Sequence, residues 1–426
     1  MRNPRLLKLF AVLAGVLLFG AACARDEGGG SAGGGGAECP DDEFGCVEIG
    51  ADEPIKLGTL LVISGPNASL GLDSQYGVQV AVDMRGEVAG HEIELENQDD
   101  GCAAEGGQAG AQALVSDPQI VAVIGTSCSS AGVPAAEITS EKGVLMVSPS
   151  NTAPDLTDPE THQPFYARTA HNDKVQGAAM AQFVAEELDG QTAATIHDGS
   201  PYADGLQSVF ADVFESQFDG EITEQEAIQV GDKEFRSVLT SIASQSPDYL
   251  YYPVFVPEGA AITQQARQTS GLSDTDLGGA DGMLSSDFVA AAGGDSAEGM
   301  YLSGPDLSYS GGFYKDEFLP AYAEISGEKE GKVLSVFHAH AFDATNIVLD
   351  AIEEVAIETD DGGLLIPRTE LRDAVFATED YEGVIGNLAC DENGDCNPQT
   401  TIAVNQVKNG EFVPVFQVEL KLEETQ

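Results

Sequence analysis

The chain has 426 residues, with 71 acidic and 19 basic side chains and a formal net charge of −52. This excess argues against nucleic acid or anionic lipid as a partner, because both carry negative charge themselves. The acidic residues are spread along the chain rather than gathered in blocks, so we interpret them as a solvated surface and not as a functional tail. A salt-rich habitat would suit such a surface, since salt screens its self-repulsion.

Residues 1–22 have the features of a secretory signal. Basic residues precede an apolar run at 9–19, and small residues then lead to Cys23. The run is too short for a membrane-spanning helix, which needs about 20 apolar residues. The small residues before the cysteine resemble a bacterial lipobox, which predicts that Cys23 is lipidated and that the protein is anchored at the extracellular face of the membrane. Plain secretion with cleavage nearby is the alternative.

Residues 23–53 are expected to form a flexible tether that contains a small disulfide loop. The stretch 26–36 is rich in glycine and has no large apolar residue, which is typical of a flexible linker. Roughly 360 residues remain for the folded body, more than one hydrophobic core usually serves, so we expect two lobes.

In the folded body, apolar strands alternate with helical patterns. Predicted strands lie at 55–63, 91–97, 120–124, 144–147, 192–197, 226–230 and 249–254. Predicted helices lie at 75–84, 103–116, 129–142, 175–188, 235–243, 258–269 and 334–356, with another that ends at Phe218. This alternation predicts an α/β fold with parallel sheets covered on both faces. Asn409-Gly410, between two apolar runs near the C-terminus, predicts a hairpin turn.

Hydroxyl-rich loops follow two consecutive buried strands. The first contains Ser127, Cys128 and Ser129, and the second contains Ser150, Asn151 and Thr152. Parallel strands deliver such loops to one edge of the sheet, where open α/β sheets bind ligands. Free N–H groups at the helix start near Ser129 suit an anion such as a carboxylate. Helix capping would explain one hydroxyl, but not two such loops.

Seven cysteines are consistent with a lipidated Cys23 and three disulfide bonds. The six remaining cysteines allow 15 pairings in an oxidising compartment. Cys39–Cys46 and Cys390–Cys396 are close in sequence and are expected to close small loops, which leaves Cys102 with Cys128. Zinc binding is the alternative, but the chain has no CxxC motif and only 6 histidines.

Other motifs do not indicate an enzyme, a cofactor or a metal site. His338 and His340 lie two positions apart on an expected helix and point in different directions. Residues 391–395 resemble the start of a calcium loop, but Ile402 stands where a bidentate acid is needed, so a disulfide-closed turn is favoured. Residues 125–129 lack the second glycine of a nucleophile elbow, and the chain has no P-loop.

A series of short motifs resembles one known family. In order, they are Ile63-Ser64-Gly65-Pro66, Asp99-Asp100-Gly101-Cys102, Ile124-Gly125, Cys128-Ser129-Ser130, Ser148-Pro149, Thr152-Ala153-Pro154 and Tyr202-Ala203-Asp204-Gly205. Their order and spacing are similar to those of the periplasmic leucine/isoleucine/valine-binding proteins of ABC importers. The resemblance runs from Ile55 to beyond Asp395.

The resemblance implies two α/β lobes that are joined by three crossovers and close over the ligand by a hinge. Residues 54–169 with 304–398 would form one lobe, and residues 170–303 with 399–426 the other. It also implies the Cys102–Cys128 disulfide and delivery of the ligand to an ABC permease. We expect a monomer that contacts the membrane only through its lipid anchor.

The resemblance also implies roles for individual residues. Ser129 would hold the carboxylate of an amino acid, and Thr152 with the Ser150 carbonyl would hold the ammonium and part of the carboxylate. Tyr202 would close over the ligand, and Asp281 would face the ammonium. A buried zwitterion needs such paired charges. A turn residue in a glycine-rich loop is the alternative for Asp281, and an ordinary core residue is the alternative for Tyr202.

Two positions depart from the family pattern. Leu70 stands where an aromatic residue is usual, and Phe255 replaces a tyrosine. Ser150 and Asn151 are also more polar than the usual small pair. These differences leave the ligand side chain open. A branched-chain or other apolar amino acid is the predicted ligand. The alternative is a sensor lobe or binding protein for an amide, urea or aromatic acid, and an adhesive surface protein ranks third because it would not explain the hydroxyl loops.

Overall fold

The computed structural model describes residues 37–309 and 311–422. The predicted signal sequence, Cys23 and the glycine-rich stretch lie outside the described residues. Among the helices that are described, none combines the length and the apolar character needed to cross a membrane.

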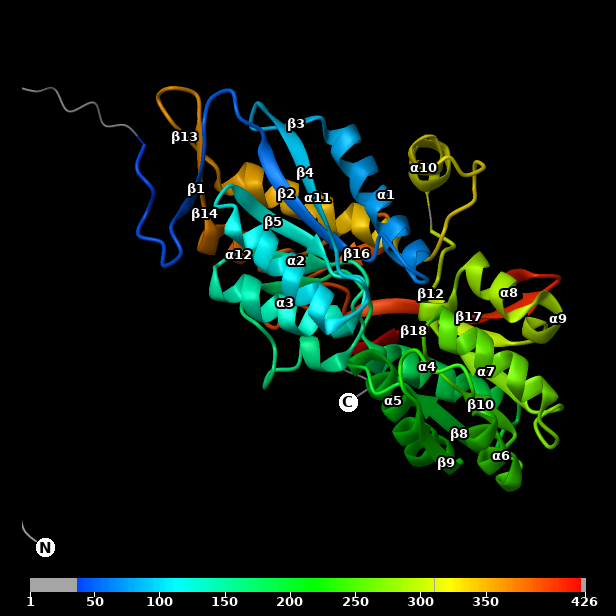
Figure 1. The fold of residues 1–426 in the computed structure, drawn as a ribbon. Coiled ribbons are helices and arrows are strands. Elements are labelled where there is room, and N and C mark those ends of the chain that lie inside the picture. The colour runs from blue at the N-terminus through cyan, green and yellow to red at the C-terminus, as the bar shows by residue number, and fades with distance from the viewer. Residues whose placement is uncertain (1–36, 310, 423–426) are drawn as a thin grey trace, which may run out of the picture. The chain divides into compact units, whose positions relative to one another are not determined.

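One sheet has six strands, and its central strands are parallel (Figure 1). In spatial order the strands are β3 (Glu87–Val88), β4 (His91–Asp99), β2 (Ile55–Leu61), β5 (Ile120–Gly125), β6 (Leu145–Ser148) and β7 (Tyr166–Arg168). Only β3 runs antiparallel to its neighbour β4. The carboxyl ends of β5 and β6 therefore lie side by side at one edge of the sheet.

Helices cover both faces of this sheet, as a parallel sheet requires. On one face the apolar core includes residues of α1 (Ala68–Arg85), α11 (His338–Val355) and α12 (Arg368–Phe376). On the other face it includes residues of α2 (Ala104–Ser116) and α3 (Ser129–Glu141). Ile124 belongs to the first core and its neighbour Val123 to the second, because successive side chains of a strand point to opposite faces.

A second sheet has seven strands. In spatial order they are β18 (Glu411–Lys421), β17 (Gln399–Lys408), β12 (Tyr301–Pro305), β11 (Asp276–Gly279), β10 (Tyr249–Tyr251), β8 (Thr192–His197) and β9 (Glu221–Ala227). Its helices are α4 (Asp173–Glu186), α5 (Pro201–Phe218), α6 (Arg236–Gln245), α7 (Val256–Gln268), α8 (Ser286–Ala292) and α9 (Gly294–Ala297). Pairing is parallel from β9 to β12 and antiparallel from β12 to β18.

Smaller elements complete the described chain. A three-stranded sheet is formed by β1 (Cys46–Ile49), β14 (Leu364–Pro367) and β13 (Ile357–Glu358), and a separate pair by β15 (Tyr381–Gly383) and β16 (Gly386–Leu388). The remaining helical segments are η1 (Pro154–Leu156), η2 (Asp281–Met283), η3 (Tyr314–Phe318) and α10 (Leu319–Ser326).

The predicted α/β fold with two parallel-dominated, helix-covered sheets is confirmed. The chain passes from the six-stranded to the seven-stranded sheet after Arg168, leaves it after Pro305, and returns at Gln399. The boundaries assigned to the two lobes remain a prediction.

The predicted turn at Asn409-Gly410 is also present. Both residues have positive φ angles, 53° and 78°, and they join β17 to β18. Disulfide bonds join Cys39 to Cys46, Cys102 to Cys128, and Cys390 to Cys396, the same pairs that the sequence predicts.

The helix predicted at 75–84 begins earlier than expected, because α1 starts at Ala68 and includes Leu70. Gly71 also lies in this helix and allows close packing. A Cβ atom at Gly71 would lie 2.1 Å from the carbonyl oxygen of Val62. Glycine here therefore lets α1 lie directly against Val62, which follows β2.

Several other predicted boundaries also differ from the structure. Strand β9 covers 221–227 rather than 226–230, and it lies at the sheet edge with mostly exposed or half-buried residues. An edge strand needs no apolar run, so the search for one placed it too late. Strand β10 ends at Tyr251 rather than at 254, and α11 begins at His338 rather than at 334. Tyr202 lies in the first turn of α5.

Candidate functional site

The two hydroxyl-rich loops contact each other at the edge of the six-stranded sheet. The Ser150 hydroxyl donates to the Ser127 carbonyl (2.9 Å), and the Ala153 N–H donates to the Ser129 hydroxyl (3.2 Å). The predicted proximity follows from the adjacent, parallel strands β5 and β6. Ser129 is the first residue of α3, so the first N–H groups of that helix, which lack intrahelical acceptors, lie beside the second loop.

Much of the polar character of these loops holds the loops themselves together. Asn151 Nδ2 donates to the Thr126 carbonyl (3.0 Å), and the Thr126 hydroxyl donates to Asn151 Oδ1 (3.0 Å). The Ser127 hydroxyl accepts from the Val62 N–H (3.0 Å). The side chains of Ser127, Ser150 and Asn151 are thus committed to contacts within the protein, which accounts for the polar pair at Ser150 and Asn151.

Thr152 differs from its neighbours. Its hydroxyl is buried and has no hydrogen-bond partner in the part of the chain that the structure describes. A buried polar atom without a partner is uncommon in proteins and calls for an explanation. This hydroxyl is available to a ligand.

A buried acid, Asp100, forms hydrogen bonds that hold the first hydroxyl-rich loop. Asp100 accepts hydrogen bonds from the Cys102 N–H and the Ser127 N–H, both at 2.7 Å. Burial raises the pKa of Asp100 to about 7. The Cys102–Cys128 disulfide bond joins the loop that contains Asp100 to the first hydroxyl-rich loop. The strands before these cysteines, β4 and β5, are separated by β2 in the sheet.

Asp281 lies in η2, which follows β11 of the seven-stranded sheet, and it is almost fully buried. Its Oδ1 atom accepts from Gln176 Nε2 (2.8 Å) and from the Tyr202 hydroxyl (3.1 Å). Burial raises the pKa of Asp281 to about 6, although these two hydrogen bonds oppose the shift. Asp281 and Tyr202 are therefore joined by a hydrogen bond in one buried polar group.

Asp173 is a buried acid that the sequence analysis missed. It is the first residue of α4, it is fully buried, and neither carboxylate oxygen has a hydrogen-bond partner within the described ranges. Burial and the nearby charge of Asp281 raise its pKa well above the usual value. Arg168 and the neighbouring Thr152 hydroxyl oppose that shift, although the hydroxyl is not placed to form a hydrogen bond.

Asp173 also joins the two parts of the site, because its N–H donates to the Thr152 carbonyl (2.9 Å). An acid in the first turn of a helix is common, since it favours the helix dipole, so its position alone did not distinguish it. Its place directly after a sheet-to-sheet passage is the signal that would have found it.

His171, Asp173 and Asp281 place ligating atoms within 4.8 Å of one another. Burial lowers the pKa of His171 to about 4, so its imidazole is neutral. A neutral imidazole and two carboxylates can hold a cation, either a metal ion or an ammonium group. His338 has another role, because its Nδ1 atom contacts Asp73 Oδ2 (3.0 Å); His338 and His340 are both buried.

Apolar side chains complete the site. The Tyr202 ring packs against Phe255 with a centroid distance of 5.2 Å. Leu70 and Cys128 belong to the same apolar cluster as these rings, although they come from the other sheet. This composition suits an apolar portion of a small ligand.

All the predicted ligand residues are buried, and they lie in two groups. One group is on the six-stranded sheet and its helices, and consists of Leu70, Ser127, Cys128, Ser129, Ser150, Asn151 and Thr152. The other is on the seven-stranded sheet and its helices, and consists of Tyr202, Phe255 and Asp281. Their roles toward a ligand remain predictions.

Comparison with known proteins gives a match over most of the chain. The family model described as "Periplasmic binding protein" matches residues 54–411. A leucine-, isoleucine-, valine-, threonine- and alanine-binding protein of Pseudomonas aeruginosa is 29% identical over 355 residues, which cover 83% of this chain and 89% of the relative.

Two solved structures agree with this match. A leucine-binding protein of Thermotoga maritima is 26% identical with a TM-score of 0.75, covering 85% of this chain and 98% of its own. A branched-chain amino acid transporter substrate-binding protein of Streptococcus pneumoniae, in complex with isoleucine, is 26% identical with a TM-score of 0.73, covering 87% and 100%. These relatives are solute-binding proteins and not enzymes. The chain therefore belongs to the periplasmic binding protein family.

Proposed function

We propose that this protein binds a small apolar amino acid, of the branched-chain type, between its two sheets. The observation that carries the proposal is that the site contains unlike groups. The α3 N-terminus and the Thr152 hydroxyl offer hydrogen-bond donors, and Asp173 and Asp281 offer buried carboxyl groups. A carboxylate suits the first group and an ammonium suits the second.

The relatives support this ligand class, since their names include leucine, isoleucine and valine. The apolar surface formed by Leu70, Tyr202 and Phe255 suits an aliphatic side chain. We further propose that the protein is anchored through a lipidated Cys23 at the extracellular face of the membrane and delivers its ligand to an ABC permease. The sequence before residue 37 supports the anchor.

A second ligand class is favoured by one observation. Asp173 and Asp281 both have raised pKa values, so a protonated carboxyl is accessible at mildly acidic pH. A protonated carboxyl can donate to a carbonyl oxygen, which would suit an amide, a urea or a carboxylic acid that lacks an ammonium group.

A thermal-shift screen of the mature chain with the twenty amino acids and a set of small amides tests the proposal. A ligand that binds only the native state at a hundred times its Kd adds about 2.7 kcal/mol of stability. We expect leucine, isoleucine or valine to raise the Tm most. A Tm shift with amides but with no amino acid would overturn the proposal.

The screen is repeated with EDTA and with Zn²⁺, because His171, Asp173 and Asp281 can also hold a metal ion. An amino acid that shifts the Tm equally in EDTA binds without a metal. A shift that requires Zn²⁺ would instead assign these three residues to a metal.

A further inference from the structure

Arg168, a fully buried residue at the end of β7, contacts the second hydroxyl-rich loop on both sides of Thr152. Its Nη1 atom donates to the carbonyl of Asn151 (3.3 Å) and to the carbonyl of Ala153 (2.8 Å). The carbonyl between them, that of Thr152, accepts from the Asp173 N–H. Three successive carbonyls are therefore held, which fixes the direction of the Thr152 side chain.

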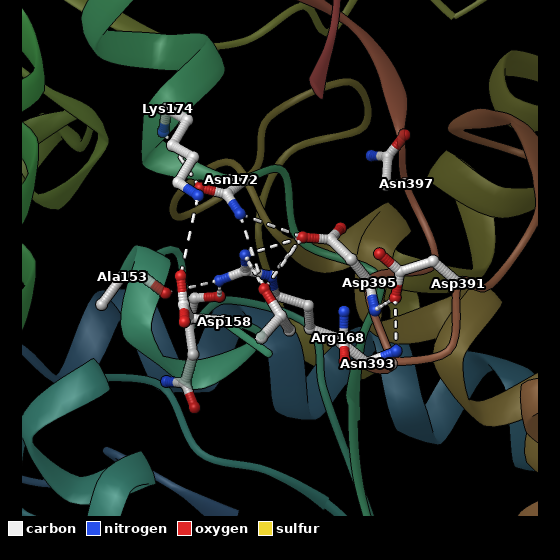
Figure 2. Close-up of polar contacts among 12 residues, drawn as sticks. Ala153, Asp158, Arg168, Asn172, Lys174, Asp391, Asn393, Asp395 and Asn397 are labelled. Carbon is white, nitrogen blue, oxygen red and sulfur yellow. Dashed lines mark hydrogen bonds and ion pairs between the residues drawn. The ribbon is translucent and has the colours of Figure 1, made fainter. Parts of the chain in front are cut away.

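Asp395 is the counter-ion of Arg168 and is fully buried as well. Its Oδ2 atom lies 2.7 Å from Arg168 Nη2 and 3.2 Å from Nε. The same oxygen accepts from Thr157 Oγ1 and from Asn172 Nδ2, both at 3.1 Å. Figure 2 shows Arg168 between the Ala153 carbonyl and the Asp395 carboxylate, with Asn172 directed at the same carboxylate.

The loop closed by Cys390–Cys396 holds Asp395 in place. The Asp395 N–H donates to Asp391 Oδ1 (2.9 Å), an interaction visible in Figure 2. The loop also pairs with the backbone of Arg168, whose N–H donates to Gly394 and whose carbonyl accepts from Cys396. The stretch that resembled a calcium loop thus supplies a carboxylate to an arginine.

We propose that Arg168, oriented by Asp395, is a positioning residue that presents Thr152 to the ligand. The proposal takes its ligand from the proposed function, but the contacts of Arg168 with the loop and with Asp395 do not depend on a ligand. A charged donor in a buried site forms strong hydrogen bonds, and the planar guanidinium reaches several acceptors at once. Lysine at this position would keep the charge but would not reach both carbonyls and Asp395.

The test compares Arg168→Lys with a matched control, Arg368→Lys, in the mature chain. Arg368 is also buried and also donates to two backbone carbonyls, those of Ile120 (3.2 Å) and Pro118 (3.1 Å), but these lie at the start of β5, at the opposite end of that strand from the site. Both variants are expected to lower the Tm. Only Arg168→Lys should raise the Kd for L-leucine, by about tenfold, which corresponds to the loss of one good hydrogen bond.

Hydrogen exchange supplies a readout that needs no ligand. The N–H groups of Ser150, Asn151 and Ala153 should exchange faster in Arg168→Lys and at the parent rate in Arg368→Lys. If L-leucine does not bind the parent, the proposed function fails, and the exchange data alone decide the role of Arg168. Unchanged exchange in this loop, or an equal rise in Kd for both variants, would overturn the inference.

Thr157→Val is a milder change for the case in which Arg168→Lys does not fold. It removes one acceptor from Arg168 Nη2 (2.6 Å) and one donor to Asp395 while leaving the ion pair in place. We expect a smaller rise in Kd, about threefold, and faster exchange at the same N–H groups. A folded Thr157→Val variant with parent Kd and parent exchange would count against the inference.

Discussion

Asp281 and Ser129 contribute unequally to binding in the proposed site. Asp281→Asn keeps the size of the side chain but removes its charge, so a buried ammonium would lose its counter-ion, which typically costs about 3–5 kcal/mol. Ser129→Ala removes one hydroxyl and leaves the backbone N–H groups, with an expected loss of roughly 1.5–3 kcal/mol. Titration calorimetry with L-leucine should therefore show the larger loss of affinity for Asp281→Asn.

A buried acid that is not among the proposed ligand residues is the control for this comparison. Asp343 accepts from the N–H groups of Val384 and Ile385, and Asp343→Asn should leave the Kd unchanged. If Asp281→Asn binds as tightly as the parent while Ser129→Ala fails to bind, the ligand has no ammonium group and the amide or carboxylic-acid alternative moves ahead.

The raised pKa of Asp281 predicts how affinity depends on pH. An ammonium ligand needs the ionised carboxylate, and protons compete for it below the pKa of about 6. The Kd is therefore expected to rise about tenfold between pH 7 and pH 5. Calorimetry at the two pH values measures this, and Asp281→Asn, which removes the titration of Asp281 but keeps that of Asp173, should reduce the dependence. A Kd that is lower at pH 5 would favour the protonated-carboxyl alternative.

The stability of the ligand-free protein depends on pH with a defined sign. Burial raises the pKa of Asp281 in the folded state above its unfolded value, so the folded state holds its proton more tightly. The stability that this group contributes is fully present below the unfolded pKa, near 4, and is lost as pH rises through about 6. A ligand ammonium would restore stability at neutral pH, because it pairs with the charge.

At the residue scale, the sequence indicated residues in loops that directly follow buried strands. It missed residues that are brought together from distant parts of the chain. Ser129 and Thr152 were found because two consecutive buried strands deliver them to one sheet edge. Arg168 and Asp395 are 227 residues apart. Between them the chain passes to the seven-stranded sheet and then leaves it again. No local pattern marks such a pair; the sequence around Asp395 predicted only the disulfide-closed turn, which the structure confirms.

At the element scale, the close contact between α1 and Val62 predicts a sensitive glycine. In Gly71→Ala the added Cβ would meet the Val62 carbonyl oxygen, a backbone atom that cannot move aside easily. Overpacking of this kind typically costs about 1–3 kcal/mol. Denaturant unfolding should show that loss. It should also show almost none for Gly294→Ala, where nothing lies within 4 Å of the added atom.

A loss of stability equal for Gly71→Ala and Gly294→Ala would contradict this account of α1. Since Leu70 is the adjacent residue, Gly71→Ala is also expected to weaken ligand binding.

Element prediction succeeded where strands are buried on both faces and failed at edges and helix starts. The predicted strand at 120–124 agrees with β5 to within one residue, because its continuous apolar run marks a central strand. The edge strand β9 carries no such run, and the start of α1 was hidden because Gly71 is a tertiary packing residue. These two failures have the same origin, since neighbours distant in sequence decide both.

At the scale of the whole molecule, contacts from both sheets predict a hinge motion. A ligand held by Thr152 on one side and Asp281 on the other favours the state in which both contacts form. Solution scattering with saturating L-leucine should therefore give a smaller radius of gyration than the ligand-free protein. An unchanged radius of gyration, with binding confirmed by calorimetry, would contradict the hinge model.

The apolar cluster around Tyr202 and Phe255 has a consequence for heat capacity. Val62, Leu70 and Cys128 from the first sheet belong to that cluster. If the sheets separate when the ligand leaves, these side chains meet water, and hydrated apolar surface has a high heat capacity. Binding would then carry a negative heat-capacity change larger than a single small ligand can account for, so that the binding enthalpy becomes steadily more favourable as the temperature rises.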